Sequence, residues 1–240
     1  MFESLKSRSD QLEIMDDFNC EGQVVDQTLR ELHKINSYLG GNQISINSLS
    51  KLTKKNSQEN YSIVDLGCGG GDTLKLFANW GNKKNINLDL IGIDANSYIT
   101  DYAKKNCQGF ENINFSGENI FGKDFKKKKF DIAHCSLFLH HFTEEEIVSL
   151  FKQLMGQVKI GIIINDLHRH PISYYFTKWL LTAWSRSEMV KFDSVVSVAK
   201  SFKRRELESY LERAGIKNYT LKWKWAYRWE LVINNTYNGL

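Results

Sequence analysis

The chain has 240 residues, of which 42% are hydrophobic and 25% are charged, and its formal net charge is +4. An ordinary apolar content with a small net charge excludes an intrinsically disordered chain, and the length suits one domain or one domain with a cap. So small a charge over this length also gives no reason to expect nucleic acid as a partner.

Neither the first residues nor the cysteines indicate export, membrane insertion or metal binding. The N-terminal residues carry charges throughout, unlike a signal peptide, and no run approaches the roughly 18 apolar residues of a membrane-spanning helix. The four cysteines, whose separations fit no zinc site, are Cys20, Cys68, Cys107 and Cys135. We therefore expect a cytoplasmic protein with reduced thiols, no metal and no stable membrane insertion.

The first quarter of the chain is expected to be helical. Over residues 10–39, apolar side chains such as Leu29 and Leu32 recur three and four residues apart, and the glycines at 40 and 41 are typical of a helix end. Residues 42–60 are polar and are expected to form a short helix and a linker. These segments predict an N-terminal helical lid over residues 1–57.

Strands and helices then alternate. Buried strands are expected at residues 61–66, 88–94, 113–116, 130–136 and 159–165. Helices are expected at residues 73–80 and 98–106, and a further helix begins near Thr143, which forms a capping box with Glu146. This alternation predicts an α/β fold, in which a parallel sheet carries helices on both faces.

The last third of the chain departs from this alternation and is rich in aromatic residues. Residues 167–202 predict a helical insertion, whose aromatic side chains are Tyr174, Tyr175, Phe176, Trp179, Trp184 and Phe192. These side chains are expected to form either one wall of a binding pocket or an ordinary helical core. Residues 204–214 predict an amphipathic helix, and residues 217–234 predict two strands joined by a turn.

A glycine-rich turn follows the first strand, where residues 65–72 read DLGCGGGD. Glycines in such a turn let a ligand approach the backbone closely. The dinucleotide fingerprint G-x-G-x-x-G would require glycine where Asp72 stands, and this carboxylate would face a pyrophosphate at the helix N-terminus. No G-K-[ST] follows, so a phosphate-binding P-loop is excluded as well.

The pattern D-x-G-x-G-x-G instead resembles motif I of the class I S-adenosylmethionine (SAM)-dependent methyltransferases. Three further segments carry the resemblance: the strand that ends at Asp94, the segment around Glu118, and the strand over residues 130–136 with the LHH that follows it. A carboxylate at Asp94 suits the two ribose hydroxyls, because it accepts two hydrogen bonds. Glu118, where the family more often has Asp, is expected to accept from the adenine amino group.

The resemblance implies a fold, a cofactor and a set of binding residues. It implies a Rossmann-like seven-stranded sheet with strand order 3-2-1-4-5-7-6 and an antiparallel last strand, in a domain over residues 58–240. The cofactor implied is SAM, with S-adenosylhomocysteine (SAH) as its product. The residues expected to bind it are Asp65, Gly67, Gly69, Gly71, Asp94, Ala95, Glu118, Asn119, Ile120, Cys135 and Ser136.

Histidines follow the fourth and fifth strands, where the active site of an open α/β sheet lies. His140 is our first candidate for a base that removes a proton from the methyl acceptor, and His168 is the second, because the unperturbed histidine pKa of about 6.5 lies near neutral pH. His140 as a wall residue of the pocket, His141 as a residue that orients the loop, and His168 as a surface or capping residue remain alternatives. Asp166 either bonds to a histidine or caps the next helix.

The residues 165–167, the pair His140-His141 and the run IMDD at residues 14–17 resemble a bacterial subgroup of small-molecule methyltransferases. Its members are related to the quinol methyltransferases of ubiquinone and menaquinone synthesis and to those of polyketide or aryl-pigment pathways. This resemblance implies methyl transfer to O or C of an aromatic, quinol or polyketide-like acceptor by a monomer or homodimer.

Two other classes of function compete with this hypothesis. One is a SAM-binding interaction module without catalysis, and the other is a methyltransferase that acts on protein or nucleic acid. The basic run at residues 126–129 has no interleaved aromatics, so a solvated loop explains it better than a nucleic-acid contact. No N-P-P-Y motif for a flipped base is present either.

Overall fold

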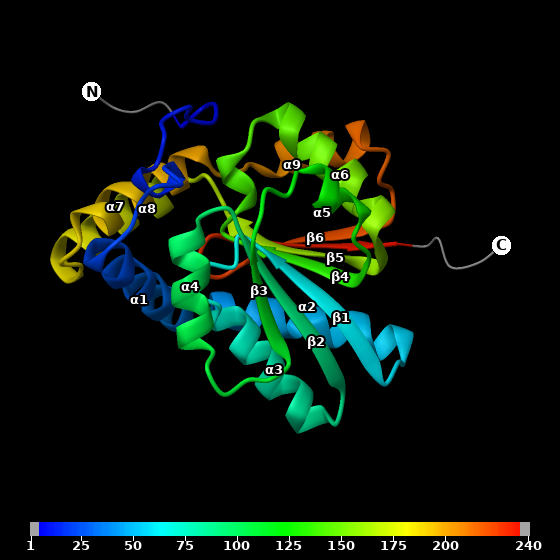
Figure 1. Cartoon of the computed structure of the whole chain (residues 1–240). Helices are drawn as coiled ribbons and strands as arrows, with labels where there is room; N and C mark the ends of the chain where they lie inside the picture. The colour runs from blue at the N-terminus through cyan, green and yellow to red at the C-terminus, as the bar shows by residue number, and fades with distance from the viewer. Residues whose placement is uncertain (1–4, 236–240) are drawn as a thin grey trace.

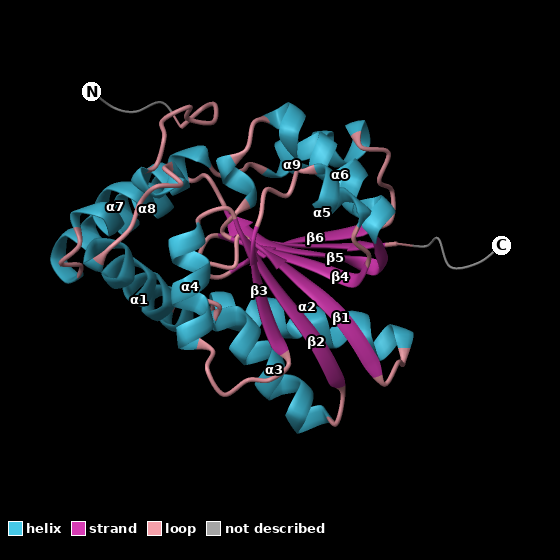
Figure 2. Cartoon of the chain, in the orientation of Figure 1, coloured by secondary structure: helices cyan, strands magenta, loops and turns pink. Residues whose placement is uncertain are grey.

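A single mixed sheet lies between two layers of helices in the computed structural model, which describes residues 5–235 (Figures 1 and 2). Its strands are β1 (Asn60–Leu66), β2 (Asn87–Asp94), β3 (Ile113–Gly117), β4 (Phe130–Ser136), β5 (Val158–Leu167), β6 (Tyr219–Lys224) and β7 (Arg228–Asn234). Their order is β3-β2-β1-β4-β5-β7-β6, with β1 to β5 paired in parallel and β7 antiparallel to both of its neighbours. The predicted strand order and the antiparallel last strand are confirmed.

The helices divide into three groups around this sheet. They are α1 (Gln23–Tyr38), α2 (Gly41–Asn56), α3 (Asp72–Lys84), α4 (Ser97–Asn106), α5 (Lys123–Lys127), α6 (Glu144–Gln157), α7 (Pro171–Trp184), α8 (Glu188–Lys200) and α9 (Arg204–Arg213). Helices α2 and α3 cover one face, with α4 packed on β2 and β3 at the edge of the sheet, and α5, α6 and α9 cover the other face (Figure 1). Helices α1, α7 and α8 pack together beyond the carboxyl ends of the strands.

The central strands are buried because helices cover both faces of the sheet. Ile63 and Val64 of β1 and Ile132 and Ala133 of β4 are fully buried. Helix α6 begins with the predicted capping box, in which the Thr143 hydroxyl accepts from the Glu146 amide and the Glu146 carboxylate accepts from the Thr143 amide.

The N-terminal quarter differs from the prediction of a lid followed by a linker. Helix α2 is 16 residues long and packs on β5 and β7, with Leu49 and Leu52 in the core. Its polar serines suggested a linker, but Ser45 and Ser48 are buried and hydrogen-bond to His134 and to Glu230 of the sheet. Helix α1, the short 3₁₀ turn η1 (Ile14–Asp16) and the segment before η1 lie over the strand ends.

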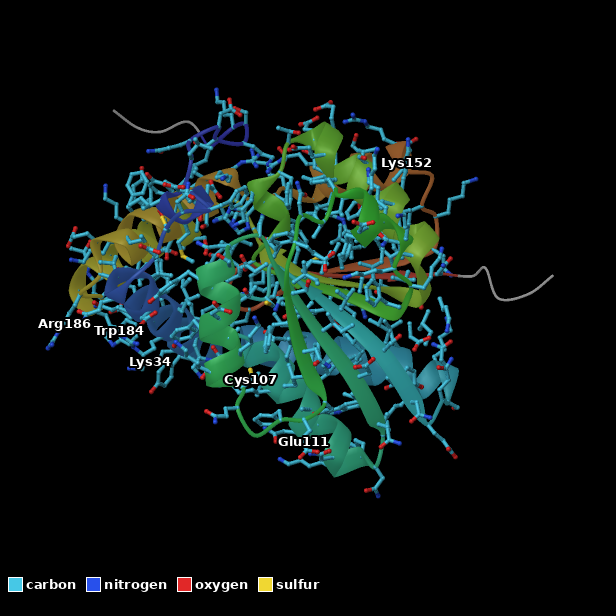
Figure 3. The ribbon with its side chains drawn as sticks, viewed as in Figure 1. Lys34, Cys107, Glu111, Lys152, Trp184 and Arg186 are labelled. Atoms are coloured by element: carbon cyan, nitrogen blue, oxygen red, sulfur yellow. The ribbon has the colours of Figure 1, made fainter. Side chains whose placement is uncertain are left out.

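The predicted insertion after β5 is a pair of helices, α7 and α8, joined at residues 185–187. This joint contacts α1, since Ser187 hydrogen-bonds to Thr28 and Ser185 donates to Glu31. Figure 3 shows Trp184 and Arg186 at this outer end of the molecule. None of the helices within residues 5–235 combines the length and the apolar character that a membrane crossing needs.

Candidate active site

A cavity of about 800 Å³ lies at the carboxyl ends of the strands. Its floor is made by the turns after β1, β2, β3 and β4, and its roof by α1, α7, α8 and the segment before η1. Nine of the predicted cofactor-binding residues line it: Asp65, Gly67, Gly69, Asp94, Ala95, Glu118, Asn119, Ile120 and Ser136. Of the predicted catalytic residues, His140 lines it.

The glycine-rich turn presents its backbone to the cavity. Gly67 and Gly69 adopt positive φ values of 65° and 50°, a region that glycine enters without strain. A Cβ at Gly67 would lie 2.1 Å from the ring of Phe138, which packs across the turn. A ligand can therefore approach the Gly69 backbone closely, since a Cβ there would meet only Leu29, at 3.7 Å.

Two carboxylates at the ends of β2 and β3 also line the cavity. Asp94 accepts from the amides of Gly69, at 3.3 Å, and Asn96, at 3.1 Å, so its carboxylate is fixed at the cavity wall. Burial raises the pKa of Asp94, although these backbone hydrogen bonds oppose the shift. Glu118 pairs with Lys128 through one carboxylate oxygen.

Two predicted cofactor residues lie outside the cavity lining. Gly71 forms the N-terminal cap of α3 with a φ of 76°, and a Cβ there would collide with Cys107 and Phe115, so this glycine serves the packing of the turn. Cys135 is 1% exposed and lies in the apolar core between the sheet and α6. The alternating direction of side chains along β4 explains why Ser136 faces the cavity while Cys135 does not.

Asp65, the acid that opens motif I, is engaged within the protein. Its carboxylate accepts from His134 Nδ1 at 2.7 Å, and His134 Nε2 contacts the Ser45 hydroxyl at 2.8 Å. Ser45 also hydrogen-bonds to Asn165. This buried chain connects the base of the glycine turn to α2 and β5.

His140 lies in the 3₁₀ turn η2 (Leu139–His141) and is 1% exposed. Its Nδ1 is 2.7 Å from Asp166 Oδ1, and the other oxygen of Asp166 accepts from the Leu139 amide at 2.9 Å. Of the two roles left open for Asp166, the structure therefore shows the bond to histidine. His140 Nε2 faces Glu13 Oε1 at 3.5 Å, and both atoms are buried without a hydrogen-bond partner.

The charge around His140 favours its protonated form. Burial by itself lowers the pKa of this histidine, but Asp166 and Glu13 outweigh burial and raise the pKa to about 9. The pKa of Asp166 is lowered, because the attraction of His140 and its hydrogen bonds overcome the effect of burial. At neutral pH the ring is thus mainly an imidazolium, with Nδ1–H donating to Asp166.

A second layer of charges surrounds Glu13. His141 Nδ1 lies 2.6 Å from Asp16 Oδ1, and Lys200 Nζ lies 3.0 Å from Asp16 and 3.7 Å from Glu13. Ligand atoms of Glu13, His140 and His141 lie within 4.8 Å of one another, an arrangement that is also compatible with a metal. Lys200 already supplies a positive charge to these carboxylates.

The segment before η1 is a part of the site that sequence reasoning missed. Arg8 donates to the backbone carbonyls of His140 and Phe142, at 2.8 Å each, and so holds the η2 turn. Glu13 in this segment then reaches His140. The one sequence signal near this segment was the IMDD run that begins next to Glu13. That run indicated a family resemblance and did not predict that the segment contacts His140.

His168 does not line the cavity. Its backbone N–H donates to Tyr227 O, its Nδ1 accepts from the indole N–H of Trp223 at 3.2 Å, and its ring packs on Trp229. Burial and the neighbouring cations lower its pKa to about 4. His168 therefore packs against the β6–β7 hairpin outside the cavity lining, and it is neither the predicted base in the cavity nor the surface or capping residue of the alternative.

Comparisons with known proteins agree with this fold. Residues 63–161 match the family described as "Methyltransferase domain". An uncharacterized methyltransferase of Synechocystis is 28% identical over 116 residues, which span 48% of this chain and 50% of that protein. A carboxy-S-adenosyl-L-methionine synthase of Campylobacter jejuni is 24% identical over 187 residues, 70% of this chain and 74% of that protein.

Among solved structures, the plantazolicin methyltransferase BpumL, determined with SAH and a monoazolic analog, superposes with a TM-score of 0.64 at 17% identity, covering 86% of this chain and 89% of that one. At such identity the likeness concerns the fold. The matching domain, the strand order and the glycine turn with its two acids together support a class I SAM-dependent methyltransferase that resembles the bacterial small-molecule methyltransferases.

Proposed function

We propose that this methyltransferase transfers the methyl group of SAM to O or C of an aromatic, quinol or polyketide-like small molecule. The observation that carries the proposal is the composition of the cavity at His140. The glycine turn and Asp94 line the same cavity as His140 and a set of apolar residues of α1 and α7. A site for a flat apolar acceptor has this composition, with many apolar residues and few polar ones.

The cofactor half of the cavity fits SAM by its chemistry. Asp94 accepts the two ribose hydroxyls, and the free oxygen of Glu118 accepts from the adenine amino group. The backbone of Gly67 and Gly69 lies along the amino-acid portion, which has no phosphate for Asp72 to repel. When bound, SAM supplies a methyl group on a positively charged sulfur that is already activated for transfer.

His140 and Glu13 handle the proton of the acceptor. Their Nε2 and Oε1 atoms are 3.5 Å apart and lack a hydrogen-bond partner, and both residues line the cavity, so an acceptor hydroxyl that enters between these atoms can bond to both. In its neutral form, His140 removes the hydroxyl proton at Nε2, and Asp166 stabilises the imidazolium that results. The roof formed by α1, α7 and α8 excludes water and orients the acceptor.

Asp94→Ala tests the cofactor half of the proposal. Calorimetry with SAH should give binding to the wild-type chain and a loss of about 100-fold in the variant, because two hydrogen bonds to a carboxylate are removed. Asp89→Ala is the matched control, since Asp89 lies on the same strand but is exposed. SAH that fails to bind the wild type would overturn the proposal.

Turnover distinguishes an enzyme from a binding module. The chain is incubated with methyl-labelled SAM and a panel of phenols, quinols and enols. Labelled product from a member of this panel supports the proposal. Tight SAH binding together with label transferred only to protein or nucleic acid in a cell extract would instead favour one of the alternatives.

A further inference from the structure

Arg228 is a buried cation at the wall of the cavity, and the function described above does not use it. It is the first residue of β7, is 2% exposed and lines the cavity where β5 ends. Its Nη1 donates to Asn165 Oδ1 at 3.3 Å and its Nη2 to Asn36 Oδ1 at 2.6 Å, both of them neutral amides. Its Nε is buried without a hydrogen-bond partner.

A second buried arginine shows what Arg228 lacks. Arg169 is 1% exposed, forms an ion pair with Glu206 and donates to the Ser201 carbonyl. Within residues 5–235, no carboxylate forms an ion pair with Arg228. The acid that attracts it, Asp166, already binds His140 and two backbone amides.

The guanidinium remains charged at neutral pH. Burial lowers the pKa of Arg228, and the attraction of Asp166 opposes this effect, so that the pKa is about 10. A buried charge without a counterion is costly, and such groups are normally paired. The cost indicates that a ligand supplies the missing negative charge.

The position of Arg228 assigns it to the acceptor end of the cavity. Along the carboxyl edge of the sheet, Glu118 and Asp94 follow β3 and β2, the glycine turn follows β1, and Asp166 and Arg228 stand at β5 and β7. Three strand spacings separate β1 from β7, which is about 14 Å. This places Arg228 on the far side of His140 from the ribose-binding carboxylate.

The backbone of Gly41 shapes the surroundings of the guanidinium. A Cβ at Gly41 would lie 2.9 Å from Arg228 Cζ, so the glycine lets α2 cover this side of the group. On the edge of the guanidinium that includes Nε, the Nε–H group has no acceptor. Such an edge matches the two oxygens of a carboxylate.

We infer that Arg228 binds a carboxylate group of the ligand, and that the acceptor supplies it, so that the substrate is a carboxylate-bearing aromatic or polyketide-like molecule. This inference rests on the proposed function and narrows its substrate class. The same chemistry is present in the amino-acid carboxylate of the cofactor, which is the other possible source.

The test uses a matched pair of neutral and anionic probes. 4-Hydroxybenzoate and 4-hydroxybenzamide are titrated by NMR into the full-length chain saturated with SAH. We expect the benzoate to bind at least about tenfold more tightly, because the neutral benzamide cannot form the charge-assisted hydrogen bonds of a carboxylate. Arg228→Lys should remove most of this preference, and Arg169→Lys, the control with a buried but already paired arginine, should keep it.

A second titration identifies the source of the carboxylate. Arg228→Lys is compared with the wild type for binding of SAH and of decarboxylated SAH. Weaker binding of SAH alone assigns Arg228 to the carboxylate of the cofactor, whereas unchanged SAH binding with a lost benzoate preference assigns it to the acceptor.

The inference is overturned if Arg228→Lys changes neither the preference for benzoate over benzamide nor the preference for SAH over decarboxylated SAH. Where Arg228→Lys does not fold, as judged by thermal unfolding, equal binding of benzoate and benzamide to the wild type overturns it. Failure of SAH to bind the wild type would reject the proposed function itself, and that result is separate from the comparison of the two probes.

Discussion

The two ends of the cavity are built in different ways. At the cofactor end, one turn of five residues and two acids at strand ends supply backbone and carboxylates, each next to its own strand. At the acceptor end, Glu13, His140, Asp166 and Arg228 come from four segments that are far apart in the chain and meet only in the fold. The first end is built from features that are local in the sequence, and the second from residues that only the fold brings together.

The largest effect expected is on catalysis alone. His140→Gln should lower kcat/KM by about 10²- to 10⁴-fold, because it removes the group that takes the acceptor proton. SAH affinity should remain unchanged, since the ribose and adenine contacts are elsewhere. His168→Gln is the matched control and should retain activity, because His168 faces the hairpin rather than the cavity. Full activity of His140→Gln would remove the base from the mechanism.

The pH dependence of kcat/KM also tests whether His140 acts as the base. Because the pKa of folded His140 is raised to about 9, the neutral ring that acts as a base becomes more abundant as the pH rises toward 9. We therefore expect kcat/KM to rise by about tenfold between pH 7 and 8 and by about fivefold more up to pH 9. A profile that falls over this range would indicate that the imidazolium is a hydrogen-bond donor to an anionic acceptor.

Stability should change in the opposite direction over the same range. A histidine whose folded pKa exceeds its unfolded value of about 6.5 stabilises the fold fully below that value, and this contribution is lost as the pH rises through 9. The free energy of unfolding should therefore decline between pH 7 and 9, and less so in His140→Gln. Equal declines in both proteins would assign the pH dependence to other groups.

The contrast between the two ends explains which parts could be predicted from the sequence. Asp94 and Gly67 could be predicted because a strand end and a glycine pattern, together with the family resemblance, identify their positions locally. Glu13 and Arg228 carry no local signal, since an acid before a short turn and a basic residue at a strand start are both common on surfaces.

The position of helix α2 likewise could not be predicted from a local sequence signal. Its strand-facing serines pair with polar residues of the sheet, so the burial of the helix does not appear as an apolar stripe. The predicted order of the strands needed no such information, because the alternation of strands and helices and the final hairpin determine it once the family resemblance is known.

The smallest effects expected concern the aromatic residues of α7, for which the sequence left a pocket wall and a helical core as alternatives. Phe176 lines the cavity, whereas Trp179 is 68% exposed and lies outside the lining. Phe176→Ala should raise the KM of an aromatic acceptor by about tenfold, because a side chain buried by the bound acceptor is worth roughly 1.5–3 kcal/mol. Trp179→Ala should leave this KM unchanged, since its ring points to solvent. Initial rates over a range of acceptor concentrations measure both values, and an equal rise in the two variants would show that the solvent side of α7 also contacts the acceptor.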